Sequence, residues 1–95
     1  MTSKQRAYLR ALANKISPIF QVGKNGLNDN LIKQINDALE ARELIKFKIL
    51  ETAPDDNYSL AQSIASDTNS DLVQIVGNIA TLYRKKKNNS KIQLP

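Results

Sequence analysis

The chain has 95 residues, which fits one domain, because chains usually divide at about 100–200 residues per domain. It contains no cysteine and no histidine, so disulfides, thiol nucleophiles, zinc sites and histidine general bases are excluded. Lysine and arginine exceed aspartate and glutamate by 14 to 9, and 41% of the residues are hydrophobic. This composition predicts a folded basic binding domain. No apolar run exceeds three residues, so we expect no membrane span, no signal peptide and a cytoplasmic location.

The net charge of +5 is distributed unevenly along the chain. Residues 1–24 and residues 84–91 each carry five basic side chains and no acid, whereas residues 51–71 carry five acids and no base. Basic patches attract polyanions, of which phosphate backbones are the commonest. Charge alone leaves an alternative of equal weight, in which the terminal lysines only keep the protein soluble.

A helix is predicted first, starting at residue 2 or 3 and ending before Pro18. Thr2 and Gln5 have the spacing of a capping box. Apolar residues then follow at helical spacing, at Leu9, Leu12, Ala13 and Ile16. Arg6 and Arg10 lie off this stripe, one turn apart. Such a like-charge pair costs about 0.2–0.5 kcal/mol in a helix, which a bound anion would relieve.

Residues 19–22 predict a short strand, and residues 23–26 predict a loop. Asn28 suits a helix N-cap and Asp29 suits a first turn, so a second helix is predicted to about Ala41. Residues 44–50 then alternate with period two. The apolar positions of this strand face one side, and Lys46 and Lys48 face the other, which we expect to be open.

A turn is predicted at residues 54–57, followed by a third helix to about Thr68. Residues 72–76 and 79–83 are two strands around Gly77 and Asn78, a pattern typical of a hairpin with a primed turn. Beyond Arg84 the apolar residues no longer follow a helix or strand periodicity. We therefore predict one domain over residues 1–84, followed by a basic, flexible C-terminal tail over residues 85–95.

The predicted order is α-β-α-β-α-β-β. It describes a two-layer α+β fold with a four-stranded mixed sheet and with helices mainly on one face. Both β-α-β crossovers are expected to give parallel strand pairs, and the final hairpin adds an antiparallel strand.

The sequence Gly-Lys-Asn-Gly at residues 23–26 has the clearest chemical meaning. Glycine lacks Cβ and accepts positive φ, so a G-x-x-G loop lets the main chain approach a ligand closely. Its backbone N–H groups can hold phosphate, Lys24 adds a cation and Asn25 adds a donor. KH domains clamp the backbone of about four nucleotides with such a loop. Two glycines often make only a turn, but the strand before the loop, the capped helix after it and the basic setting favour phosphate contact.

Other chemistry finds little support in the sequence. The nucleotide-binding patterns G-x-x-x-x-G-K-[ST] and G-x-G-x-x-G are absent. Asp55 and Asp56 could ligate Mg²⁺, but adjacent acids in a turn are usually solvated. Phe20 and Phe47 are expected in the core, which argues against base stacking and for recognition of backbone and shape. We expect no enzyme activity, cofactor, metal or small-molecule substrate, because no nucleophile and base have a suitable spacing.

Short sequence blocks along nearly the whole chain match the sequence pattern of a single protein family. They are residues 2–6, 8–13, 22–27, 38–48, 73–78, 82–84 and 91–95. These blocks, with Gly-x-x-Gly-Leu, Glu-Leu-Ile-Lys and Leu-Tyr-Arg at their centre, resemble the bacterial stand-alone CRM (chloroplast RNA splicing and ribosome maturation) domain of the YhbY-like proteins. The acidic stretch at residues 51–56 departs from the pattern.

The resemblance implies a fold like the C-terminal domain of translation initiation factor three, and RNA binding through the glycine loop and nearby basic residues. It also implies association with precursors of the large ribosomal subunit. We expect a monomer that assists ribosome assembly. The residues expected to contact RNA are Gly23, Lys24, Asn25, Gly26, Arg6, Arg10, Lys46, Lys48, Arg84 and Lys85. The alternative is a protein-interaction or ribosome-docking module that does not recognise RNA directly.

Overall fold

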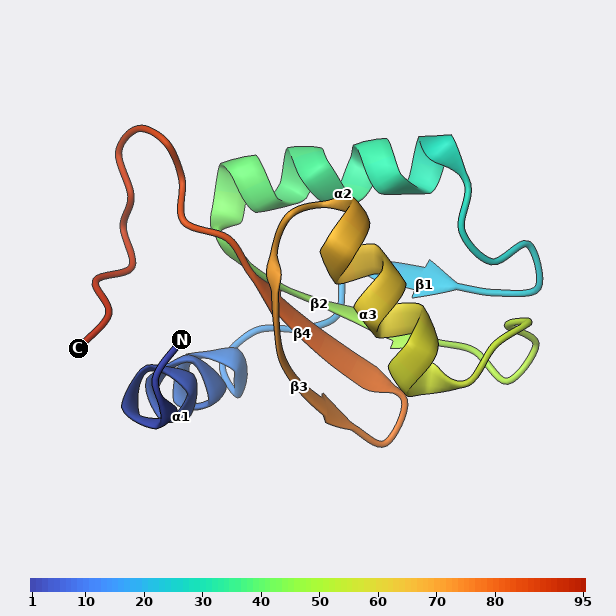
Figure 1. The fold of residues 1–95 in the computed structure, drawn as a ribbon, viewed down its shortest axis with the longest axis horizontal. Helices are drawn as coiled ribbons and strands as arrows, with labels where there is room; N and C mark the ends of the chain where they lie inside the picture. Colours follow the sequence, from blue (N-terminus) through green and yellow to red (C-terminus); the bar gives the residue numbers. More distant parts are fainter.

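The computed structural model describes all 95 residues and contains the three helices and four strands expected from the sequence (Figure 1). Their bounds are α1 (Ser3–Ala13), β1 (Phe20–Val22), α2 (Asp29–Arg42), β2 (Leu44–Ile49), α3 (Asn57–Asp67), β3 (Asp71–Val76) and β4 (Ile79–Tyr83). None of the helices has the length and apolar character needed to cross a membrane.

The predicted caps and turn form as the sequence indicates. Thr2 and Gln5 make a complete capping box at the start of α1, and the side chain of Asn28 accepts a bond from the amide of Leu31. Gly77 takes φ +60° as the first of the two residues that join β3 to β4. A glycine with positive φ at this position is typical of a type II′ hairpin turn.

The sheet has the order β1-β2-β4-β3. β1 pairs parallel to β2, and β4 pairs antiparallel to both β2 and β3. The expectation that both crossovers give parallel pairs is therefore right for β1 and β2 and wrong for β2 and β3. The chain leaves one position free when it crosses from β2 to β3, and the second strand of the hairpin, β4, fills that position.

One face of the sheet packs against α2 and α3 and forms the main core. Phe47, Ile45 and Leu82 contribute from the sheet, and Ile35 and Ile64 contribute from the two helices. All five side chains are buried. The period-two pattern of β2 predicted this face correctly, because alternate residues of a strand point to opposite sides.

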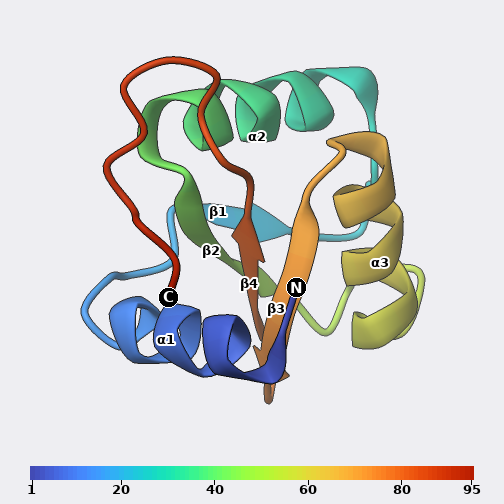
Figure 2. The ribbon, with the colours of Figure 1, turned by 60° about the vertical axis from the view of Figure 1, so that its left-hand side comes forward.

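α1 lies on the opposite face and covers only one end of the sheet (Figure 2). Leu9 and Ala13 of α1 pack on Leu44, Val73 and Tyr83. The pairing of β3 with β4 shifts between Leu72 and Gln74, which makes Val73 an extra residue. Val73 lies one residue after Leu72 of the main core face, so strand alternation directs it to the α1 cluster. The rest of this face, which carries Lys46 and Lys48, is not covered by a helix.

The C-terminal segment folds back along the sheet toward α1 (Figure 2). Ile92 and Leu94 pack against the α1 cluster, and the side-chain amide of Gln5 donates to the carbonyl oxygen of Pro95 at 3.3 Å. Residues of the predicted C-terminal tail therefore contact α1 and its cluster in this structure. Composition alone did not show that a few apolar residues of a polar segment find a partner surface.

Candidate nucleic-acid interface

The glycine loop forms a tight turn between β1 and α2. The amide of Gly26 donates to the carbonyl oxygen of Gly23 at 2.9 Å, so Lys24 and Asn25 occupy the tip. Both tip residues are exposed, and their backbone N–H groups form no hydrogen bond within the chain. The turn therefore presents two free amide donors beside one lysine ammonium group. This arrangement is suited to binding an anion.

The two glycines of the loop have different roles. Gly26 is buried with φ +58°, and a Cβ placed there would lie 2.9 Å from Cγ of Pro54. Gly23 has ordinary φ, and its nearest neighbours would lie 3.6–3.7 Å from an added Cβ. The fold thus requires glycine at position 26. It does not require glycine at position 23, where the absence of a side chain lets a ligand come close to the backbone.

A cleft of about 500 Å³ lies beside the loop, between the end of β1 and the start of α2. Twelve residues line it, and none of them is acidic. Five carry side-chain amides: Gln21, Asn25, Asn28, Asn30 and Gln34. Asp29, which follows the helix cap, does not line the cleft. The amides of Gln21, Asn30 and Gln34 were not identified from the sequence, because only the fold brings β1 and α2 together around the loop.

Lys46 and Lys48 lie on the uncovered face of the central strand β2, as the alternation predicted. Lys48 pairs with Gln21 of β1 and with Ile79 of β4, and direct partners share one face of a sheet. Gln21 also lines the loop cleft. The lysine face and the loop cleft therefore meet at Gln21 on the edge strand.

Arg6, expected in the interface, instead connects α1 to the edge strand β3. Its Nη1 donates to the carbonyl oxygens of Leu72 and Val73 at 2.8 and 2.6 Å. These carbonyls lie at the irregular part of β3. One terminal nitrogen of the guanidinium thus satisfies free backbone acceptors at a sheet edge and holds the side chain against β3.

Arg84 joins three elements at the end of β4. Its Nη1 donates to Oδ1 of Asn36 at 2.7 Å and to the carbonyl oxygen of Thr68 at 2.6 Å. Its Nη2 donates to the carbonyl oxygen of Asn36 and lies 3.4 Å from the carboxylate of Glu40. The side chain is only 22% exposed. Arg84 therefore holds α2 and the end of α3 against the sheet.

Arg10 and Lys85 are exposed, but they do not lie near the loop. Arg10 is in the last turn of α1, and Lys85 follows β4. The loop is at the opposite end of the sheet (Figure 1). The structure thus brings together the loop, Lys46 and Lys48, and separates them from the four other arginines and lysines of the expected set.

Glu43 begins the Glu-Leu-Ile-Lys block, and the sequence alone does not indicate a role for it. It is 1% exposed and has φ +68° directly after α2. Its carboxylate accepts bonds from the amides of Lys91, Lys86 and Ile92, and from Oγ of Ser90. Burial opposes ionisation of this carboxyl, but these bonds stabilise the charged form and lower its pKa. Glu43 therefore anchors the C-terminal segment.

The structure holds no group of three or more histidine, cysteine, aspartate or glutamate side chains that could share a metal ion. Asp56, one of the two acids considered for magnesium, instead caps α3. Its carboxylate accepts bonds from the amide and the hydroxyl of Ser59, and these bonds lower its pKa.

The solution structure of the hypothetical protein SAV1595 from Staphylococcus aureus superposes with a TM-score of 0.84, at 50% identity, over 100% of this chain and 99% of that one. The probable RNA-binding protein YqeI of Bacillus subtilis is 48% identical over 100% of this chain and 99% of its own length. An RNA-binding protein of Haemophilus influenzae is 34% identical over 100% of this chain and 95% of its own. Residues 1–84 match the CRS1/YhbY (CRM) domain model. The chain is therefore a member of the CRS1/YhbY (CRM) domain family.

Proposed function

We propose that this protein binds single-stranded RNA by clamping its phosphate backbone at the glycine loop. One observation carries the proposal: the free amides of Lys24 and Asn25 project beside a cleft that is lined by amide side chains and by no acid. Backbone amides and a lysine can hold phosphate oxygens, and side-chain amides can hydrogen-bond to base edges or to phosphate. The names of the relatives in Bacillus and Haemophilus support RNA as the partner.

Lys46 and Lys48 supply the electrostatic field next to the loop. Neither forms an ion pair, and the uncovered sheet face presents both to solvent at half-burial. Lysine stems commonly lie along apolar surface while the ammonium group stays in water. We assign Arg10 and Lys85 to a weaker, long-range contribution, because they lie at the other end of the sheet. Arg6 and Arg84 contribute charge but are held by internal bonds.

The RNA that we propose as the target is ribosomal RNA in precursors of the large subunit, where the protein assists assembly as a monomer. The resemblance of the sequence to the stand-alone CRM domains supports this choice. A small basic domain that binds backbone phosphate can hold a flexible RNA segment without requiring one particular sequence.

Replacement of the two tip residues tests the clamp. K24Q/N25A changes only exposed side chains, so the fold should be retained, and its affinity for single-stranded ribosomal RNA fragments should fall about tenfold. K33Q is the matched control, because Lys33 is exposed on α2 and pairs with Asp37 at 3.5 Å. It should change affinity less than about twofold. Equal RNA affinity of K24Q/N25A and the wild type would reject the clamp.

The salt dependence of binding tests the phosphate contacts. If about five phosphates are neutralised, the log–log slope for single-stranded RNA should be about −3.5. An affinity that does not change with salt would contradict the proposal. A protein that binds no ribosomal RNA fragment but binds proteins of the precursor particle would support the alternative function, a docking module.

A further inference from the structure

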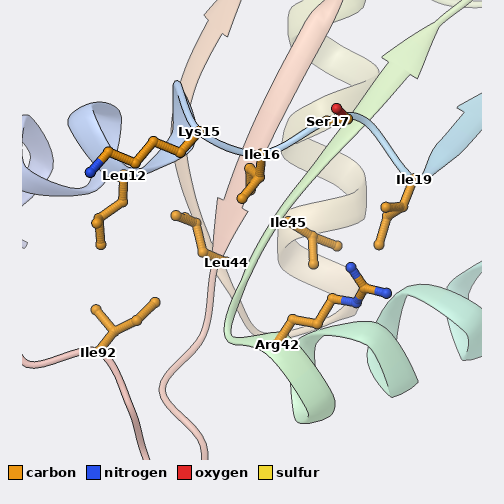
Figure 3. A pocket seen from close by; sticks show the side chains of 9 residues that line it. All are labelled: Leu12, Lys15, Ile16, Ser17, Ile19, Arg42, Leu44, Ile45 and Ile92. Carbon is orange, nitrogen blue, oxygen red and sulfur yellow. The ribbon is translucent and has the colours of Figure 1, made fainter.

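A second hollow lies at the other end of the edge strand and is largely apolar (Figure 3). Its volume is about 590 Å³, within the range of about 300–1,000 Å³ typical of small-ligand sites. Its apolar walls are formed by Leu12, Ile16, Ile19, Leu44, Ile45 and Ile92. The hollow exists because β1 pairs only with residues 47–49 of β2. The first residues of β2 therefore have no β1 partner.

Two cations stand at this hollow without a partner. Lys15 and Arg42 line it, and neither forms an ion pair within the chain. No acidic residue lines the hollow. In Figure 3 the guanidinium of Arg42 extends toward Ile19 and Ile45, whereas the amine of Lys15 lies beyond Leu12. An apolar hollow with two unpaired cations fits a ligand that is apolar in one part and anionic in another.

The hollow is connected to the loop cleft along the edge strand. Ile19 lines the apolar hollow and also a shallow depression that includes Gln21 and Lys48. Gln21 in turn lines the loop cleft. The two sites are thus joined by one continuous surface along β1. At about 3.3 Å per residue, the distance from Ile19 to Gly23 is about 13 Å.

We propose that this hollow binds one base of the RNA strand whose backbone is held at the glycine loop. The proposal rests on the proposed function and extends it from backbone binding to base binding. The base lies against the isoleucine walls, the guanidinium of Arg42 stacks on it or pairs with the adjacent phosphate, and Lys15 holds a further phosphate. The part of the RNA strand between the two sites runs along β1 past Lys48.

RNA explains the whole hollow better than an apolar peptide does. A peptide segment would cover the isoleucine walls but would leave both cations without a partner. A nucleotide combines a flat apolar ring with a phosphate. Arginine can stack on the ring or donate hydrogen bonds to the phosphate. Aromatic platforms are not required, because the walls and the guanidinium together enclose the ring.

Isoleucine methyl resonances of the full-length protein provide a direct test. Single-stranded octamers of adenosine and of uridine are titrated into protein with labelled isoleucine methyl groups. A base ring in the hollow should shift the methyl signals of Ile16, Ile19 and Ile92, because of its ring current. The signals of Ile35 and Ile64 should not move, because both are buried in the main core. An abasic octamer should bind at the loop without shifting the methyl signals of the hollow.

Two variants with the same change of charge complete the test. Ile19 and Val76 are both exposed, at 37% and 63%, but Ile19 directly precedes the edge strand β1 and Val76 ends the opposite edge strand β3. I19D should weaken binding of the intact octamer about tenfold, and V76D should change it less than about twofold.

The outcomes separate this inference from the proposed function. Suppose that K24Q/N25A loses RNA binding, that RNA does not shift the methyl signals of the hollow in the wild type, and that I19D and V76D have the same RNA affinity. The base site is then wrong, and the loop clamp stands. If the wild type binds no RNA, both fail. Shifts of these methyl signals that grow with protein concentration in the absence of RNA would assign the hollow to a second copy of the chain and overturn the base site.

Discussion

The carboxylate of Glu43 accepts a hydrogen bond of 2.6 Å from the backbone amide of Lys91, 48 residues further along the chain. Three more donors from the same segment reach this carboxylate. A buried charge of this kind is retained only where hydrogen bonds replace its water. The contact therefore joins residues 86–92 to the residue that follows α2, and Ile92 of this segment lines the apolar hollow.

E43Q should lower stability by about 1–3 kcal/mol at neutral pH, because one oxygen that accepts bonds becomes an NH2 group that faces backbone amide donors, and the other loses its charge. Glutamine has nearly the same size and the same backbone cost at φ +68°, so the change is confined to the charge and the hydrogen-bonding capacity of the side chain. Urea unfolding measures the effect. Hydrogen exchange of the Lys91 and Ile92 amides should also accelerate. E40Q is the control, since Glu40 is exposed and pairs only weakly with Arg84. Unchanged exchange in E43Q would contradict the anchoring role.

The same carboxylate should make stability depend on pH. The folded pKa of Glu43 is lowered, so its contribution is present above the unfolded pKa of about 4.3 and is lost as the pH falls through the lower folded value. The wild type should therefore lose more stability than E43Q between neutral pH and acid conditions. Parallel pH profiles of the two proteins would show that Glu43 is not responsible.

Arg84 and Lys85 are neighbours in sequence, but we expect their replacement to have different effects on stability. R84K should destabilise the domain by about 2–4 kcal/mol, because lysine cannot reproduce the bonds to Asn36 and Thr68. K85Q should leave stability within about 0.5 kcal/mol, because Lys85 is exposed. Thermal or urea unfolding measures both. A stable R84K variant would show that these contacts contribute little.

Arg6 and Arg10 provide a second such pair, one turn apart on α1. R6Q should lower stability by about 1–3 kcal/mol, since two carbonyl oxygens of β3 lose their donor. R10Q should leave stability nearly unchanged, and it should reduce RNA affinity only slightly at low salt. Equal stability of the two variants would contradict the structural role of Arg6.

The two glycines of the loop should respond differently to alanine. G26A should destabilise the domain by about 1–2 kcal/mol through positive φ alone, and further through the contact with Pro54. P54A added to G26A should restore only the steric part. G23A should keep full stability, because its Cβ would meet ordinary contacts. Full stability of G26A would contradict the strain argument.

Much of the fold follows from local signals. The capping box at Thr2, the period-two strand at residues 44–49 and the glycine turn at Gly77 depend on near neighbours, which the sequence displays directly. The position of β4 between β2 and β3 does not depend on near neighbours. It depends on which strand forms hydrogen bonds with a neighbouring strand along both of its edges, and that is a property of the whole sheet.

For the site, the sequence by itself determined the loop, the lysine face and the excess of positive charge, because residue type and spacing are enough to define them. Only the tertiary structure decided how each charge is used. Arg6 and Arg84 end among backbone carbonyls, Lys24 remains free, and Glu43 becomes the anchor of a segment 48 residues away. The physical reason is that a charge is available to a ligand only if no internal acceptor reaches it, and internal acceptors are placed by long-range packing.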